Sequence, residues 1–278
     1  IRQRLLREQQ IIDEMKSSLE KNRFEVFLQP KYDLSNEKIV GAESLVRWTH
    51  PKLGALTPGE FIPLFEHTGF ITELDKYVWN RTCEILENWN QNGLPHIQVS
   101  VNVSRKDIYQ ENLPEIIWNI VKKHGLQPSQ LHLEITETAY TENAEQLISV
   151  VNELKKIGFL IEMDDFGTGY SSLNMLSELP IDVLALPICF MNSIKKGALQ
   201  KNNHHILEFI ISLAKWINLQ VVAEGVEKKE QVDFLRKLGC DYVQGYYYAK
   251  PMPVDEFTKL LSGPNIEVPS CTFKKSLY

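Results

Sequence analysis

Two adjacent carboxylates, Asp164 and Asp165, follow an apolar run that begins at Leu160, and glycines and Ser/Thr hydroxyls come next. This order predicts a strand that carries charge to its carboxyl end, a glycine-shaped loop and a helix N-terminus. Neighbouring carboxylates repel each other, and burial raises that cost unless a cation or protons neutralise them. A divalent metal ion is the usual solution because hard cations prefer oxygen ligands. For this stretch alone, a solvated turn with two ordinary aspartates is the alternative.

The elements that would position these groups alternate along the chain. Strands are predicted over 24–30, 39–48, 97–103, 131–137, 159–164, 182–187, 219–224 and 241–245. Helices are predicted over 72–92, 113–124, 143–157, 204–217 and 229–238, with others starting near Ser171 and Pro253. The gap between the first two strands is too short for a parallel crossover, so those strands should form an antiparallel hairpin.

Eight strands with helices between most of them predict an α/β fold, a TIM-like (β/α)8 barrel whose first strand is antiparallel. Such barrels place their sites at the carboxyl ends of the strands, where these ends converge on one axis. Acid or amide side chains lie there on most of the predicted strands: Glu43, Asn102, Glu134, Asp164, Asp165, Glu224 and Gln244.

Composition narrows the class of protein. The 278 residues carry a net charge of -6, which argues against a general nucleic-acid binder, so DNA is not an expected partner. The four cysteines are widely spaced and indicate reduced thiols in a cytoplasmic protein. No apolar run reaches the length of a membrane span. The first residue, Ile1, suggests a piece of a larger protein, such as the cytosolic part of a membrane-anchored one.

The chain divides into three segments. Residues 1–22 are expected to form a linker helix, with Leu5, Ile12 and Leu19 spaced seven apart in a heptad-like stripe. The alternative for this helix is packing on its own domain. Residues 23–262 are expected to form the barrel domain, and residues 263–278, with Gly263, Pro264 and Pro269, a C-terminal tail of low order.

The motifs resemble those of the EAL-domain family, which comprises bacterial cyclic di-GMP phosphodiesterases and their catalytically degenerate receptor relatives. The resemblance runs from about Phe24 to Leu261. The motifs occur in the family's order: Leu28-Gln29-Pro30, Glu43-Ser44-Leu45-Val46-Arg47-Trp48, His50-Pro51, Ser100-Val101-Asn102-Val103-Ser104, Leu133-Glu134-Ile135-Thr136-Glu137, Asp164 to Leu173, Val222 to Glu227, and Gln244-Gly245-Tyr246.

The resemblance implies a site that holds one or two Mg²⁺ or Mn²⁺ ions and cyclic di-GMP. Two metal ions would stabilise the attacking and leaving oxygens of a phosphodiester. The residues at the family's metal-ligand positions are Glu43, Asn102, Glu134, Asp164, Asp165 and Glu224. Those at dinucleotide-binding positions are Gln29, Leu45, Arg47 and Gln244, and those at supporting positions are Glu137 and Glu227.

Two departures from the family pattern concern one strand. Ala185 stands where active members have the lysine that works on the nucleophilic water, and Pro187 stands where they have an aspartate. No catalytic group of that pair is therefore intact. Alanine offers no donor, acceptor or charge. A positioned acid or base contributes about 10²–10⁴-fold to a rate, so phosphodiesterase activity is predicted to be weak or absent. Ser44 stands in place of the alanine of the family signature. This change replaces one small residue with another, so it argues little against the resemblance.

Three functions follow from this pattern. The favoured one is a cyclic di-GMP receptor that passes its signal to an attached domain or partner. The family commonly attaches an upstream GGDEF domain and forms homodimers through barrel-edge helices. The first alternative is an active phosphodiesterase that converts cyclic di-GMP to pGpG, with Lys195 or Lys196 in place of the missing lysine. The second is a nucleotide-independent protein-interaction module.

Overall fold

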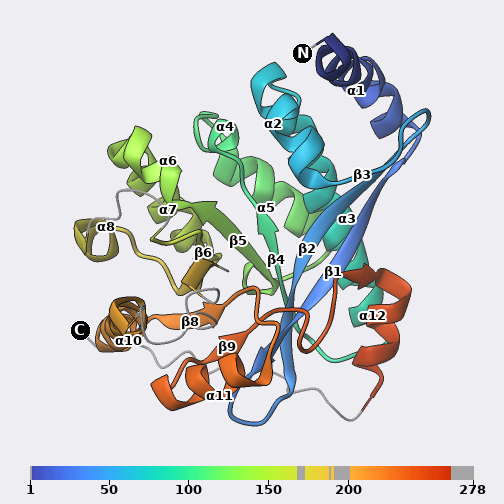
Figure 1. Ribbon diagram of the computed structural model, residues 1–278. Coiled ribbons are helices and arrows are strands. Elements are labelled where there is room, and N and C mark those ends of the chain that lie inside the picture. The colour runs from blue at the N-terminus through green and yellow to red at the C-terminus, as the bar shows by residue number, and fades with distance from the viewer. Residues whose placement is uncertain (1, 168–172, 188, 191–200, 264–278) are drawn as a thin grey trace.

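The structure is a computed structural model that describes residues 2–167, 173–187, 189–190 and 201–263. Within these residues, eight strands form a closed barrel in the order β1-β9-β8-β7-β6-β5-β4-β2, and β2 pairs back to β1 (Figure 1). The eight strands predicted from the sequence are confirmed. They are β1 (Phe24–Asp33), β2 (Ile39–His50), β4 (Gln98–Asn102), β5 (Leu131–Thr136), β6 (Leu160–Asp164), β7 (Val183–Leu186), β8 (Gln220–Ala223) and β9 (Tyr242–Val243).

Strand direction follows from the connections. β1 pairs antiparallel with β2 and with β9, whereas the pairs from β2 through β4 to β9 are parallel. The predicted hairpin is thus confirmed, and the fold is the expected barrel with its first strand inverted. Two short strands, β3 (Gly54–Leu56) and β10 (Met252–Pro253), extend the sheet beyond the ring and were not predicted.

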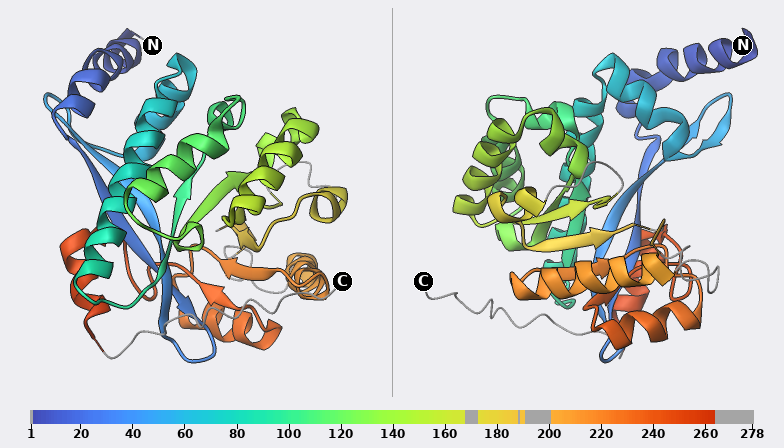
Figure 2. Two further views of the ribbon diagram at one scale, coloured as in Figure 1. Left: turned by 180° about the vertical axis from the view of Figure 1, so that it is seen from behind. Right: turned by 60° about the vertical axis from the view of Figure 1, so that its left-hand side comes forward.

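Helices cover the outside of the barrel, as the two further views in Figure 2 show. The predicted ones occur close to their expected bounds, although the expected start near Ser171 lies outside the described residues. They are α1 (Arg2–Glu20), α3 (Ile71–Gln91), α5 (Leu113–Lys123), α7 (Ala144–Ile157), α8 (Leu173–Glu178), α10 (Lys201–Trp216), α11 (Lys229–Leu238) and α12 (Val254–Leu261).

Three α-helices of the described residues were missed: α2 (Pro58–Thr68), α4 (Arg105–Ile108) and α6 (Glu137–Glu142), the last of which had been assigned partly to a strand. The start of α2 carries a recognisable signal. Thr57 and Glu60 form a capping box and Pro58 occupies the first turn, where its missing N–H is not needed. The turn chemistry therefore could have revealed this helix.

The N-terminal helix α1 packs against the barrel domain. Ile11 is 2% exposed and Ser18 is fully buried, whereas Leu5 is 59% exposed. Arg7 also pairs with Glu60 of α2. The face toward α2 and β2 thus centres on Ile11 and Ser18, while Leu19 of the predicted stripe is partly buried against the core and Leu5 is exposed. Of the tail predicted over 263–278, residues 264–278 lie outside the described part of the chain.

The apolar core fills the space between barrel and helices. At one end, the Phe24 ring of β1 lies 4.9 Å from Trp48 of β2, and both pack on Phe61 and Phe65 of α2. Among the described helices, none is long and apolar enough to span a membrane.

Candidate active site

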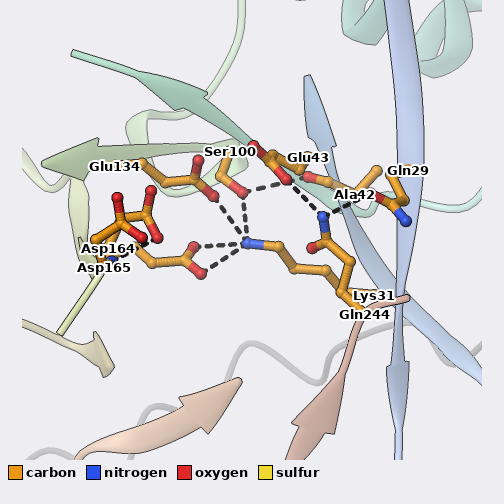
Figure 3. A network of polar contacts seen from close by, with 10 residues as sticks. Gln29, Lys31, Ala42, Glu43, Ser100, Glu134, Asp164, Asp165 and Gln244 are labelled. Carbon is orange, nitrogen blue, oxygen red and sulfur yellow. Dashed lines mark hydrogen bonds and ion pairs between the residues drawn. The ribbon is translucent and has the colours of Figure 1, made fainter. Parts of the chain in front are cut away.

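The candidate metal ligands lie at the carboxyl ends of the parallel strands, as the barrel topology requires. Asn102 ends β4 opposite Glu134 of β5, and Glu43 of β2 lies opposite Ser100 of β4. Asp164 ends β6 and Glu224 follows β8 directly. Figure 3 shows the Glu43, Glu134 and Asp164 side chains around one interior space, with the exposed Asp165 next to Asp164.

Burial and mutual repulsion raise the pKa values of Glu43, Asp164 and Glu224. Burial, with repulsion from Glu134, raises the pKa of Glu43 to about 8. Burial, with repulsion from Glu134 and Asp165, raises the pKa of Asp164 to about 7. The pKa of Glu224 is raised well above its ordinary range, first by burial and then by Asp164 and Glu43. The cluster therefore holds its negative charge at a cost that protons or cations would relieve.

The donor set fits a hard divalent ion because it offers carboxylate and amide oxygens without sulfur or imidazole. In their present positions, however, no three His, Cys, Asp or Glu side chains of the described residues form a group that could hold a metal ion. Two acids are instead turned toward internal partners. Glu43 accepts a hydrogen bond from Gln244, and Glu134 Oε1 accepts one from Lys31 Nζ at 3.0 Å. Metal binding would need Glu43 to turn away from Gln244, whereas Glu134, bonded to Lys31 through Oε1, can offer an ion its second carboxylate oxygen.

The amide groups at the dinucleotide-binding positions form a chain across the inverted strand. Gln29 Nε2 donates to the carbonyl of Ala249 at 3.1 Å, and Gln244 Nε2 donates to Gln29 Oε1 at 3.1 Å. Gln244 is only 4% exposed, yet its Oε1 atom has no hydrogen-bond partner among the described residues. A buried acceptor without a donor favours a ligand that supplies an N–H or O–H group.

Arg47 lies two residues beyond Leu45 on β2, with both side chains half-buried. Its Nη1 donates to the carbonyl of Val46 at 2.9 Å, and its guanidinium lies 5.6 Å from the centre of the Phe27 ring. Burial lowers the pKa of Arg47, but a guanidinium stays protonated in proteins. The side chain thus offers a fixed positive charge with planar donors, which suits a phosphate.

The loop after β6 is fixed by a hydrogen bond from Gly167 to Glu137 and by two residues with left-handed backbone conformations. Glu137, which is 2% exposed, accepts a hydrogen bond at 2.9 Å from the backbone N–H of Gly167. Gly167 has a φ of +88°, and a Cβ atom there would lie 2.7 Å from the Phe190 ring. Asp165 also takes a left-handed φ of +56°. Residues 168–172 of the motif lie outside the described part of the chain.

Glu227 lies farther out than the other predicted site residues. Its side chain is exposed, and its backbone N–H donates to Gln231 Oε1 at 2.8 Å. This contact caps the start of α11, because Gln231 also accepts from the backbone N–H of Lys228. A supporting role of Glu227 in the site stays a prediction.

The end of β7 is apolar. Ala185 is 1% exposed and lies opposite Val222 of β8, and Leu186 and Pro187 are also buried. This strand end therefore gives the site neither a cation nor a carboxylate. Lys195 and Lys196, the candidate substitutes for the lysine, lie outside the described residues.

Sequence reasoning missed two charged residues of this interior, Lys31 and Glu162. Lys31 Nζ lies 2.7 and 2.8 Å from the two carboxylate oxygens of Glu162. Strand periodicity could have found both. Side chains two apart on a strand share a face, and Lys31 stands two from Gln29 as Glu162 stands two from Asp164.

Comparisons with known proteins identify the family of the chain. The family model described as the EAL domain matches residues 12–251. The bifunctional diguanylate cyclase/cyclic di-GMP phosphodiesterase MucR of Pseudomonas aeruginosa is 35% identical over 247 residues, which are 89% of this chain and 36% of that protein. The cyclic di-GMP phosphodiesterase NbdA of the same organism is 35% identical over 258 residues, 93% of this chain and 33% of that protein. The chain thus spans about a third of the length of these relatives.

A solved structure, that of the PaMucR phosphodiesterase in complex with c-di-GMP, has a TM-score of 0.85 and 34% identity to this chain. The match covers 89% of this chain and 99% of that one. A second structure, the enzyme Bd1971 with cAMP and cyclic di-GMP bound, has a TM-score of 0.85 at 28% identity, and covers 92% of this chain and 69% of that one.

Proposed function

The chain belongs to the EAL-domain family, and from this premise we propose that it binds cyclic di-GMP at a divalent-metal site inside the barrel mouth. The observation that carries the proposal is the acid cluster, in which burial and repulsion raise the pKa values of Glu43 and Asp164 to about 8 and about 7. Such a cluster is costly without a cation. Buried acids with raised pKa values are typical of functional sites, where a bound cation offsets their repulsion and can in turn bind an anionic ligand.

The residues that would hold one or two Mg²⁺ or Mn²⁺ ions are Glu43, Asn102, Glu134, Asp164, Asp165 and Glu224. When bound, such ions supply positive charge to phosphate oxygens and lower the pKa of a coordinated water. The chain's own groups complete the pocket. Arg47 would pair with a phosphate, and the buried Gln244 Oε1 would accept an N–H from the ligand. Gln29 and Leu45 would line the same side, while Glu137 holds the loop that carries Asp165.

We propose further that hydrolysis of cyclic di-GMP to pGpG is weak or absent. Ala185 and Pro187 are both buried at the end of β7 and provide no group that could take or hold a proton. Binding depends on groups of other strands, which remain in place. The protein would therefore act as a receptor for the dinucleotide.

Isothermal titration of the protein with cyclic di-GMP in the presence of Mn²⁺ tests the binding proposal. Saturable binding that is lost in Arg47→Ala supports it, whereas heats that do not saturate at high micromolar dinucleotide refute it. Turnover to pGpG that vanishes in Glu43→Ala would establish the active enzyme instead. Partner complexes that form equally with wild type and with the Glu43→Ala, Arg47→Ala double variant would establish the interaction module.

The assembly around the domain is part of the proposal. We expect a cytoplasmic location, an upstream signalling module such as GGDEF, and a homodimer. The homodimer is supported by α10, where Ile206, Phe209 and Trp216 are 47%, 57% and 87% exposed and share one face of the helix. Light scattering should show a dimer for the wild type and a monomer for Phe209→Glu. A wild type that stays monomeric at a concentration on the order of 100 µM would exclude the homodimer.

A further inference from the structure

Lys31 lies in the barrel interior directly against the candidate ligand Glu134, and the metal and dinucleotide sites assigned above give it no role. Its Nζ atom lies 3.0 Å from Glu134 Oε1, 2.7 Å from Ser100 Oγ, and 2.7 and 2.8 Å from the two Glu162 oxygens. The side chain is 8% exposed, and those of Glu134 and Glu162 are 3% and 1% exposed. Figure 3 shows the amine among these oxygens.

The inverted strand explains how the amine reaches this place. β1 runs from the barrel mouth inward, so Lys31 lies deeper than Gln29, which shares its face of the strand. The parallel strands run outward, so Ser100 and Glu162 lie deeper than Asn102 and Asp164. Lys31 therefore lies below the acid cluster, on the side away from the barrel mouth.

The position of Lys31 links it to acids beyond the two that it touches. Ser100, whose Oγ lies 2.7 Å from Nζ, pairs with Glu43 across β2 and β4, and Glu134 pairs with Asn102 across β4 and β5. Glu162 lies two residues before Asp164 on the same face of β6. The amine thus lies among the strands that carry the acids, where a positive charge acts on all of them through an interior of low dielectric constant.

We propose that Lys31 is a built-in counter-ion that stabilises the carboxylate cluster while no divalent ion is bound, and a positioning residue that fixes Glu134 for the ion. The second part rests on the proposed function, whereas the first concerns the metal-free barrel alone. The competing account is a local ion pair with Glu162 that has no influence on the other acids.

A double-mutant cycle in EDTA separates the two accounts. Lys31→Met should lower the melting temperature by about 10 °C, because it leaves buried acids without their cation. Glu224→Gln should then raise the melting temperature by several degrees more in the Lys31→Met background than in wild type. Lys155, which pairs with Asp182 outside the cluster, provides the matched control: Glu224→Gln should show no such extra gain in Lys155→Met.

Two results would overturn the proposal: an unchanged melting temperature of Lys31→Met in EDTA, or an equal effect of Glu224→Gln with and without Lys31. If Lys31→Met does not fold, Glu162→Gln serves in its place. This change removes the negative charge of Glu162, so the Lys31 ammonium interacts more strongly with Glu134. Mn²⁺ should then bind about tenfold more weakly by titration. An affinity equal to that of wild type would refute the proposal.

The same titration of wild type tests the proposed function separately. A wild type that does not bind Mn²⁺ would reject the metal site, while the cycle in EDTA would still decide whether Lys31 neutralises the cluster.

Discussion

Restoring the family's pair of residues at the end of β7, by Ala185→Lys with Pro187→Asp, should turn this chain into a measurable phosphodiesterase. Ala185 is 1% exposed and shares a strand face with Val183, which pairs with the inward-facing Glu162, so the new lysine would enter the interior that holds Glu43 and Glu134. Lys31 shows that an amine among these acids keeps its charge despite burial. The new side chain should therefore be accommodated as an ammonium.

The size of the gain follows from the task of the restored group. A positioned acid or base contributes about 10²–10⁴-fold, which equals roughly 3–5 kcal/mol of barrier. The cluster would also gain one positive charge from lysine and one negative charge from aspartate, so its net charge would be unchanged. Metal affinity should consequently stay within a few-fold of the original, and the change should appear in turnover.

The assay is chromatographic detection of pGpG formed from cyclic di-GMP with Mn²⁺ at high protein concentration. Ala185→Met with Pro187→Asn is the matched control, since it supplies similar volume without charge. We expect product from the restored variant at least about 10²-fold faster than from this chain or the control. If this chain itself forms pGpG at a comparable rate, the lysine is not required for turnover and the chain is an active phosphodiesterase.

Three further outcomes are expected. Because the pKa values of Glu43 and Asp164 are raised to about 8 and about 7, and metal ions bind the deprotonated acids, Mn²⁺ affinity should rise with pH until about pH 8; calorimetry showing a flat profile from pH 6 to 8 would contradict this. Asp75 has a pKa raised well above its ordinary value, first by burial and then by Asp107, so the folded state keeps a proton that the unfolded chain loses above about pH 4 and stability falls as pH rises. Asp75→Asn should remove this loss and add about 1 kcal/mol or more to the free energy of unfolding at pH 8, and a lower value in urea titrations would refute the reasoning. Gly167→Ala should destabilise the loop by about 1–2 kcal/mol through its φ of +88° and weaken Mn²⁺ binding, which an unchanged titration would disprove.

The fold could be predicted because hydrophobic runs and turn spacing repeat eight times along the chain. Local turn chemistry was harder, and α2 was missed although Thr57, Pro58 and Glu60 mark its start. At the N-terminus, the helix was predicted but its buried face was not. Heptad spacing predicts Leu5 and Ile12 on the contact face, whereas contact with α2 and β2 buries Ile11 and leaves Leu5 exposed.

The site could be predicted only in part. Strand ends placed Asn102, Glu134 and Asp164 together because parallel strands converge. The partners of the acids, by contrast, come from residues far apart in sequence, as in the contact of Lys31 with Glu162, which lie 131 positions apart. Whether a buried acid is turned toward a lysine or toward a free space depends on packing that no local pattern contains.

The inversion of β1 also determines the end of the barrel to which the N-terminal helix α1 is connected. In an all-parallel barrel, the first strand begins at the end opposite the site. Here β1 begins at Phe24, opposite Trp48 near the end of β2, so α1 joins the domain at the end of the barrel where the parallel strands end. A pull or twist applied to α1 would reach Gln29 after five residues of one strand, and Lys31 after two more. The inverted strand therefore makes one continuous connection between the N-terminal helix and the two interior residues Gln29 and Lys31.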